Sequence, residues 1–147
     1  MALLPLETAL ARSGVERLFP DWSSRSRSRA LLADMACLGI KIRTFPKLPQ
    51  LDSEDILGTM YVLEGSRLGA RFLLARVQKS PDPVVAGTTA YLSHGAGEQP
   101  WRRFLGLLDQ HATRLDDPAK AIAAARWTFS LFELAAADLA VRGAARP

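Results

Sequence analysis

The sequence predicts an all-α fold, and three observations support this prediction. Apolar residues recur at helical spacing, as Leu31, Met35 and Leu38 do. Prolines and glycines divide the chain into segments of helical length. No alternating run of five or more residues indicates a sheet, and the one β-leaning segment, PVVAGTTAYL, is short. A mixed α/β fold would need strands that the sequence does not offer.

The first half of the chain predicts two helices and an extended connection. Residues 4–12 form a short amphipathic segment that Gly14 can end. Residues 24–38 form the second helix, with Gly39 placed as its C-cap. The connection that follows, IKIRTFPKLPQL, carries two prolines and favours extended backbone.

The longest predicted helix follows this connection. Asp52 or Ser53 can cap its N-terminus. Lys79 lies in its last turn, and Pro81 and Pro83 stop it.

The second half predicts three more helices. A short helix around TTAYL leads into a glycine-containing loop, and the next helix starts at about Glu98. In the last helix Asp117 is the N-cap and Pro118 the first helical residue, and the helix runs to about Val141.

Length and composition indicate one soluble domain. The chain has 147 residues, 48% of them hydrophobic and 23% charged, which is ordinary for a globular protein. The net charge of +4 comes mostly from arginine and is compatible with binding to a nucleic acid, an acidic membrane or an anionic ligand. We do not expect nucleic acid, because the arginines are scattered and no nucleic-acid-binding motif is present.

Cysteine usage and hydropathy predict a cytoplasmic protein. Cys37 is the only cysteine, so no intramolecular disulfide can form. The N-terminus MALLPLETALARSG lacks the basic start of a signal peptide, and no apolar window is long enough to span a membrane. The only histidines, His94 and His111, are too few for most metal clusters.

The longest predicted helix contains two interior glycines, Gly65 and Gly69. Each costs about 1 kcal/mol of helix stability relative to alanine. Together they form a notch on one face, because they lie one turn apart. Another helix, a backbone bend or a flat ligand could use this notch, and the spacing alone leaves all three open.

The stretch GTMYVLEGSRLGAR, residues 58–71, resembles the distal helix of the heme oxygenase family. The likeness is greatest to the bacterial members that supply biliverdin to bacteriophytochromes. LLPLETAL with DWSSRSRSRALLADMACLG, AYLSHGAGEQPWRRFLGLL and AIAAARWTFSLFELAAADL resemble other family segments in the same order. The resemblance covers essentially the whole chain, and it implies that the glycine helix bends and passes close over the face of a heme.

The resemblance also implies a set of candidate heme-contacting residues. Ser66 could bond a distal water or simply its own backbone. Arg102 is a candidate contact for an anionic group. Ala70 stands where the family commonly has a further glycine, which suggests a stiffer and more crowded helix. The full set of candidates is Tyr61, Gly65, Ser66, Gly69, Trp101 and Arg102.

The resemblance leaves one part of the family pattern unmatched. Relatives begin with a helix that carries the histidine ligating the heme iron, and this chain aligns after that region. We therefore expect an N-terminally truncated heme oxygenase-like domain. His94 and His111 are the only candidate replacement ligands, although an exposed loop position for His94 and a helix-terminal role for His111 are the simpler interpretations.

The run RSRSR, residues 25–29, could suggest an anion site. We interpret it instead as a solvated face, because alternate residues on a helix point in different directions and cannot meet one ligand.

Three functions are compatible with these patterns. The leading hypothesis is a degenerate, non-catalytic heme oxygenase-like protein that acts as a binding or regulatory partner, near a bacteriophytochrome or its histidine kinase. The alternative is an active enzyme that cleaves heme to biliverdin, carbon monoxide and iron. The third is a helical domain that binds another small molecule between Gly65, Gly69, Tyr61, Trp101 and Phe104.

The first hypothesis also predicts an exposed apolar face. Without the family's first two helices, more apolar surface should be exposed than a monomer tolerates. Repacking of the remaining helices, a second copy of the chain or a different protein could cover it, and a homodimer is the simplest expectation.

Overall fold

The computed structural model describes residues 2–42 and 47–144, and these residues form helices and no strand. The all-α prediction is therefore confirmed for this part of the chain. The elements, in order, are α1 (Leu3–Arg12), η1 (Val15–Arg17), α2 (Trp22–Arg25), α3 (Ser28–Cys37), α4 (Ser53–Val77), α5 (Pro83–Gly87), α6 (Ala90–Ser93), α7 (Pro100–Ala112) and α8 (Pro118–Ala144).

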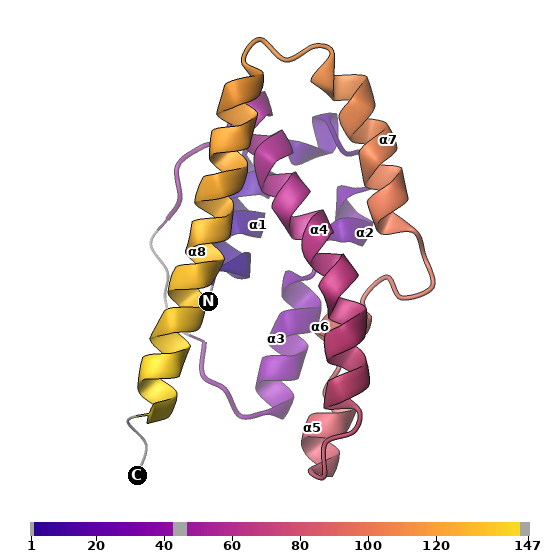
Figure 1. The fold of residues 1–147 in the computed structure, drawn as a ribbon, viewed down its shortest axis with the longest axis vertical. Coiled ribbons are helices and arrows are strands. Elements are labelled where there is room, and N and C mark those ends of the chain that lie inside the picture. The colour runs from indigo at the N-terminus through magenta and orange to yellow at the C-terminus, as the bar shows by residue number, and fades with distance from the viewer. Residues whose placement is uncertain (1, 43–46, 145–147) are drawn as a thin grey trace.

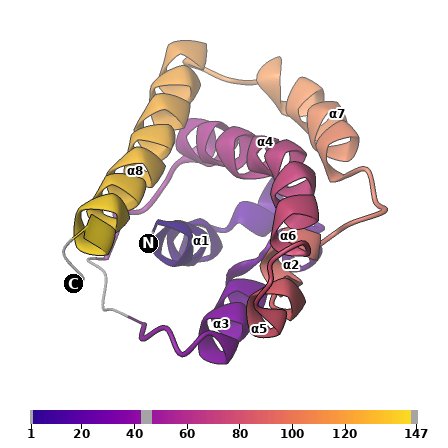
Figure 2. The same ribbon diagram turned by 60° about the horizontal axis from the view of Figure 1, so that its bottom comes forward.

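Helix α4 runs through the middle of the molecule, with α8 on one side and α7 on the other (Figure 1). Helix α1 lies inside the arrangement, surrounded by α8, α4 and α3 (Figure 2). This position explains why Leu3, Leu6 and Leu10 of α1 are almost fully buried, and why they form one cluster with side chains of α4 and α7. Members of this cluster are Leu3, Leu6, Leu10, Val15, Phe19, Leu57, Met60, Leu63 and Phe104.

Helix α4 starts where its sequence predicts. The backbone N–H of Asp55 donates to the Asp52 carboxylate at 3.1 Å, and the Asp52 N–H donates to the Asp55 carboxylate at 3.4 Å. This reciprocal pair satisfies two backbone donors that a helix start leaves free. The helix ends at Val77, two residues before the predicted Lys79.

Helices α4 and α8 cross at Gly58 with almost no space between their backbones. A Cβ atom added at Gly58 would lie 2.1 Å from the Ala121 carbonyl oxygen and 2.9 Å from the Ala124 Cβ. Close to this crossing, the buried hydroxyl of Thr128 donates to that of Thr59 at 3.2 Å. The small residues on both helices therefore allow the close approach.

The predicted helix over residues 24–38 is wrong in one respect, because it is divided into α2 and α3. Ser26 between them has extended backbone, with φ −62° and ψ 132°. The carboxylate of Glu7 on α1 accepts hydrogen bonds from the N–H groups of Arg27 and Ser28, both at 2.8 Å, and from the Ser26 hydroxyl. A carboxylate from another helix thus satisfies the first backbone donors of α3 and fixes the break. Gly39 follows α3 with φ +66°, as the predicted C-cap requires.

The β-leaning segment PVVAGTTAYL forms no strand: it is helical in α5 and α6, with Thr88 and Thr89 between them. The Asp82 carboxylate accepts from the N–H groups of Val84 at 2.8 Å and Val85 at 3.4 Å, and Pro83 occupies the first turn. An N-cap and a proline at N1 therefore outweigh the strand preference of two valines. Residues 43–46 of the predicted extended connection lie outside the described residues.

None of the helices in residues 2–42 and 47–144 has the length and hydropathy needed to cross a bilayer.

The two glycines Gly58 and Gly69 give a matched test of the helix crossing. We expect Gly58→Ala to destabilise the fold by about 1–3 kcal/mol, because its methyl group must push α8 away. Gly69→Ala should stabilise it by about 0.5–1 kcal/mol, since an added Cβ at this helical position has no heavy atom within 4 Å. Urea unfolding of both variants checks this, and equal effects would contradict the crossing described above.

Candidate functional site

One side of α4 is apolar, exposed and interrupted by two glycines. Successive helical residues are about 100° apart, so Tyr61, Gly65, Leu68, Gly69 and Phe72 lie on the same side. The three large side chains are 49%, 60% and 67% exposed, in sequence order. We call these five residues the glycine face. An apolar surface of this kind, free of charge at its centre, is typical of a contact for a flat ligand or another protein.

The two glycines of this face have different surroundings. A Cβ atom at Gly65 would lie 3.6 Å from the ring of Trp101, which is ordinary contact, whereas one at Gly69 would have no heavy atom within 4 Å. Neither position touches the backbone of another helix; that role belongs to Gly58. Of the three uses that the sequence left open, helix packing is therefore not the use of Gly65 and Gly69 in the described part of the chain. Figure 2 shows that α4 changes direction along its length.

A row of aromatic rings supports the glycine face from the side of α7. Tyr61 meets the edge of Trp101 with ring centroids 5.6 Å apart, and Trp101 stacks on Phe104 at 5.5 Å. Phe104 in turn stacks on Phe19 at 5.7 Å, and both of these rings are fully buried. The row ties the exposed Tyr61 to the core and holds Trp101 against Gly65.

Ser66 lies off the glycine face. Its hydroxyl donates to the Leu63 carbonyl at 2.7 Å and accepts from Arg27 Nη2 at 2.9 Å. Of the two roles that the sequence suggested for Ser66, the geometry shows the hydrogen bond to its own helix backbone.

The buried side of α4 carries a network of charges. Glu64 is 1% exposed, and its carboxylate accepts from Arg25 Nη1 at 2.9 Å and from Arg67 Nε at 3.0 Å. Arg25 also pairs with Asp21 at 2.7 Å, and Arg67 Nη2 donates to the Arg25 carbonyl. This network joins α2 to α4, and the paired carboxylates offset the cost of burying the guanidinium charges.

The prediction that RSRSR is a solvated face is wrong for two of its arginines. Arg25 and Arg27 are 4% and 2% exposed, whereas Arg29 is exposed. Arg25 reaches Glu64, while Arg27 donates to the Leu63 carbonyl at 2.8 Å. The arginines are buried because acceptors on α4, about 40 positions away along the chain, lie opposite them.

His94 is half-buried beside Arg67, rather than exposed as its loop position suggested. Its Nδ1 lies 3.4 Å from Arg67 Nη1, and its carbonyl accepts from the same nitrogen at 3.3 Å. Burial, and then the charges of Arg67 and Arg27, lower the pKa of the imidazole. Arg67 is two residues from Gly65 and so points about 200° away from it around the helix. His94 therefore lies on the side of α4 away from the glycine face.

His111 is held at the buried end of the aromatic row. Its Nε2 lies 3.0 Å from the Leu18 carbonyl oxygen, which can only accept, and its ring lies 6.2 Å from that of Phe19. The structural role expected for His111 agrees with this geometry. Neither histidine is directed at the glycine face.

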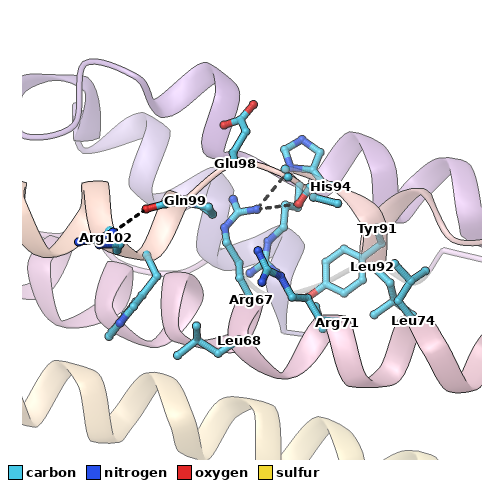
Figure 3. A pocket seen from close by; sticks show the side chains of 17 residues that line it. Arg67, Leu68, Arg71, Leu74, Tyr91, Leu92, His94, Glu98, Gln99 and Arg102 are labelled. Carbon is cyan, nitrogen blue, oxygen red and sulfur yellow. Dashed lines mark hydrogen bonds between the residues drawn. The ribbon is translucent and has the colours of Figure 1, made fainter.

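Arg102 is exposed at the start of α7, where its Nη1 donates to the Gln99 side chain at 3.1 Å. It lines a cavity of about 410 Å³ between α4 and the segment from α6 to α7 (Figure 3). Trp101 lines this cavity as well as contacting Gly65. Four of the six predicted contact residues therefore meet at the glycine face, namely Tyr61, Gly65, Gly69 and Trp101. Ser66 and Arg102 lie elsewhere.

Comparison with known proteins identifies the family. The model of the family described as heme oxygenase matches residues 4–137. The chain belongs to the heme oxygenase family. It is 34% identical over 113 residues to the heme oxygenase of Xanthomonas campestris pv. campestris, covering 76% of this chain and 67% of the relative. It is 32% identical over 108 residues to the heme oxygenase PigA of Pseudomonas aeruginosa, covering 71% and 54%. No solved structure matches the chain significantly.

These comparisons confirm the resemblance in the sequence, and the helices agree with it. The more specific association with bacteriophytochromes stays a prediction. The chain spans about two thirds of the length of one relative and about half of the other. Family membership alone therefore does not establish that this chain has the activity of the whole relatives.

Two buried carboxylates, Glu7 and Glu64, were not predicted from the sequence. One signal was available for Glu64, which falls on the same side of α4 as the apolar Leu57 and Met60. A charged residue on an apolar stripe needs a buried partner. No comparable signal pointed to Glu7, because its partners are backbone groups of a distant turn.

We expect Glu64→Gln to destabilise the fold strongly, by about 3–5 kcal/mol, because it leaves two buried guanidinium groups without their shared carboxylate. The matched control is Glu98→Gln, which breaks an exposed pair with Arg103 and should cost less than about 1 kcal/mol. Chemical unfolding of the two variants measures the difference, and similar losses would mean that the Glu64 network contributes little.

The lowered pKa of His94 predicts a pH-dependent stability. The folded state resists protonation of this imidazole, so stability is full above the ordinary histidine pKa of 6.5 and falls as the pH drops below it. His94→Gln should flatten this part of the stability curve. Thermal melting at a series of pH values tests this, and an unchanged slope in His94→Gln would contradict it.

Proposed function

We propose that this chain binds heme, or a similarly flat tetrapyrrole, on the glycine face of α4, and that it does not cleave heme unaided. In this proposal the domain is a non-catalytic member of the heme oxygenase family that acts as a binding or regulatory partner. The observation that carries it is the combination of an open, apolar glycine face with two histidines that are both directed elsewhere.

The shape of the glycine face suits a flat, apolar ring. Gly69 leaves free the space that a side chain would fill, and Leu68 and Phe72 offer exposed apolar contact on either side. Trp101 borders the face beside Gly65 and is fixed by stacking on Phe104. A rigid apolar surface loses little side-chain freedom on binding, which favours affinity.

The donor groups of the described residues do not fit iron ligation on this face. His111 is committed to the Leu18 carbonyl, and His94 contacts Arg67 on the other side of α4. When heme is bound in this family, its iron supplies the oxygen chemistry, and the axial ligand tunes it. A histidine ligand would have to come from outside residues 2–42 and 47–144, so these residues alone should bind without turnover.

The same exposed face supports a protein partner in the proposal. Parts of Tyr61, Leu68 and Phe72 would remain exposed beside a bound tetrapyrrole, and all three are exposed when none is bound. A second copy of the chain, or a bacteriophytochrome or its histidine kinase, could cover them. Such a partner could also supply the missing ligand.

The second candidate function is that of an active heme oxygenase, which yields biliverdin, carbon monoxide and iron. Family membership and the names of both relatives favour it. It requires an iron ligand from a partner or from chain outside the described residues.

Heme titration followed by absorbance tests the proposal. We expect saturation at one heme per chain, without the Soret band of a histidine-ligated heme, and a shift to an imidazole-ligated band when free imidazole is added. Gly69→Leu should weaken binding at least about tenfold, or roughly 1.4 kcal/mol, by placing a side chain where the ring lies. The control is Gly106→Leu on α7, where an added Cβ likewise has no heavy atom within 4 Å; it should leave affinity unchanged.

Addition of reductant and oxygen to the complex then separates the two candidate functions. No biliverdin should form with the chain alone. A histidine-type Soret band that disappears in His94→Gln or His111→Gln, together with biliverdin formation, would overturn the non-catalytic proposal in favour of the enzyme.

A further inference from the structure

The cavity beside Arg102 has a strongly basic lining. It lies between α4 and the segment that joins α6 to α7, and the side chains of Arg67 and Arg71 project from α4 toward it (Figure 3). Its volume of about 410 Å³ is in the range of pockets that hold small organic molecules.

Three of the four guanidinium groups that line this cavity lack a carboxylate partner. Glu64 neutralises Arg67, but Arg27, Arg71 and Arg102 form no ion pair within the part of the chain that the structure describes. The cavity contains one carboxylate, that of Glu98, which pairs with an arginine outside it at 2.7 Å.

Arg27 is the most informative of the three, because it is buried. Its Nη2 donates to two neutral acceptors, the Leu63 carbonyl at 2.8 Å and the Ser66 hydroxyl at 2.9 Å, and the guanidinium lies 5.0 Å from the ring centroid of Tyr91. Its Nη1 and Nε donate to no described atom, and Arg27 lines the cavity. Burial lowers the pKa of this guanidinium, which reflects a cation taken out of water without a counter-charge in contact.

The rest of the lining is apolar. Leu68, Leu74, Leu92 and Trp101 contribute carbon surface, and Tyr91 adds an aromatic ring. A bare inorganic ion would leave this surface unused, whereas an organic anion would bury it.

We propose that this cavity binds a small organic dicarboxylate, whose carboxylates accept from Arg27 in the cavity and from Arg71 at its rim, with its carbon skeleton against Leu74 and Tyr91. Arginine forks suit carboxylates because two parallel N–H donors match two oxygens. The charged part of this site lies apart from the tetrapyrrole position, since Arg67 and Arg71 point away from Gly65 and Gly69 on α4. Leu68 and Trp101 border both positions.

Calorimetric titration of the 147-residue chain with isophthalate, a flat aromatic dicarboxylate, tests the proposal. We expect saturable binding, with no binding of the neutral isophthalamide and weaker binding of inorganic phosphate. Arg71→Gln should reduce isophthalate affinity by at least about tenfold, in the range expected for loss of a hydrogen bond to a charged group. The matched control is Arg76→Gln, an exposed arginine on the same helix that does not line the cavity and should leave affinity unchanged.

The two histidines provide a second measurement that locates the ligand. The imidazole proton resonances of His94, which lines the cavity, should shift with isophthalate, whereas those of His111, held against Leu18, should not. Three outcomes would each overturn the proposal: isophthalamide binds as tightly as isophthalate, the two arginine substitutions have equal effects, or the resonances of both histidines shift. Tighter binding of phosphate would overturn the organic ligand class, and competition by bound heme would overturn the separation of the two sites.

Discussion

The structure depends on the carboxylate of Glu64, which is buried between Arg25 and Arg67. Both arginines join α4 to α2, and Arg67 also reaches the segment after α6. Arg25 connects α4 to α2 through Asp21, and Arg67 connects it to the backbone of α2 and to His94 after α6. Because Arg25, Glu64 and Arg67 are buried, the geometry is stable only when every partner is in place. The network thus fixes how α4 is rotated about its own axis.

This rotation decides what each side of α4 can do. With Glu64 and Arg67 turned inward, Gly65 and Gly69 are turned toward the exposed apolar side. Within the described residues, Gly65 and Gly69 therefore contact no other helix backbone. The close packing of α4 against α8 takes place about two turns earlier, at Gly58. A charged, hydrogen-bonded side and an open apolar side on one helix can hold chemically different ligands, with Leu68 and Trp101 bordering both positions.

The arginines of the chain show how much the environment changes the role of one residue type. Arg25 is neutralised by carboxylates, whereas Arg27 is buried among neutral acceptors. Arg71 stays exposed at the cavity rim. The first stabilises the fold, and the other two supply positive charge that is paired with no carboxylate among residues 2–42 and 47–144.

The sequence by itself determined the helical class, the start of α4 and the glycines that mark the candidate site. These features depend on local chemistry, such as the reciprocal bonds of Asp52 and Asp55, and on residue spacing along one helix. Only the tertiary structure decided that Arg25 and Arg27 are buried, and that the helix predicted over residues 24–38 is broken at Ser26. Both outcomes arise from carboxylate and carbonyl acceptors on distant helices, and spacing along one segment carries no information about groups that approach it from another.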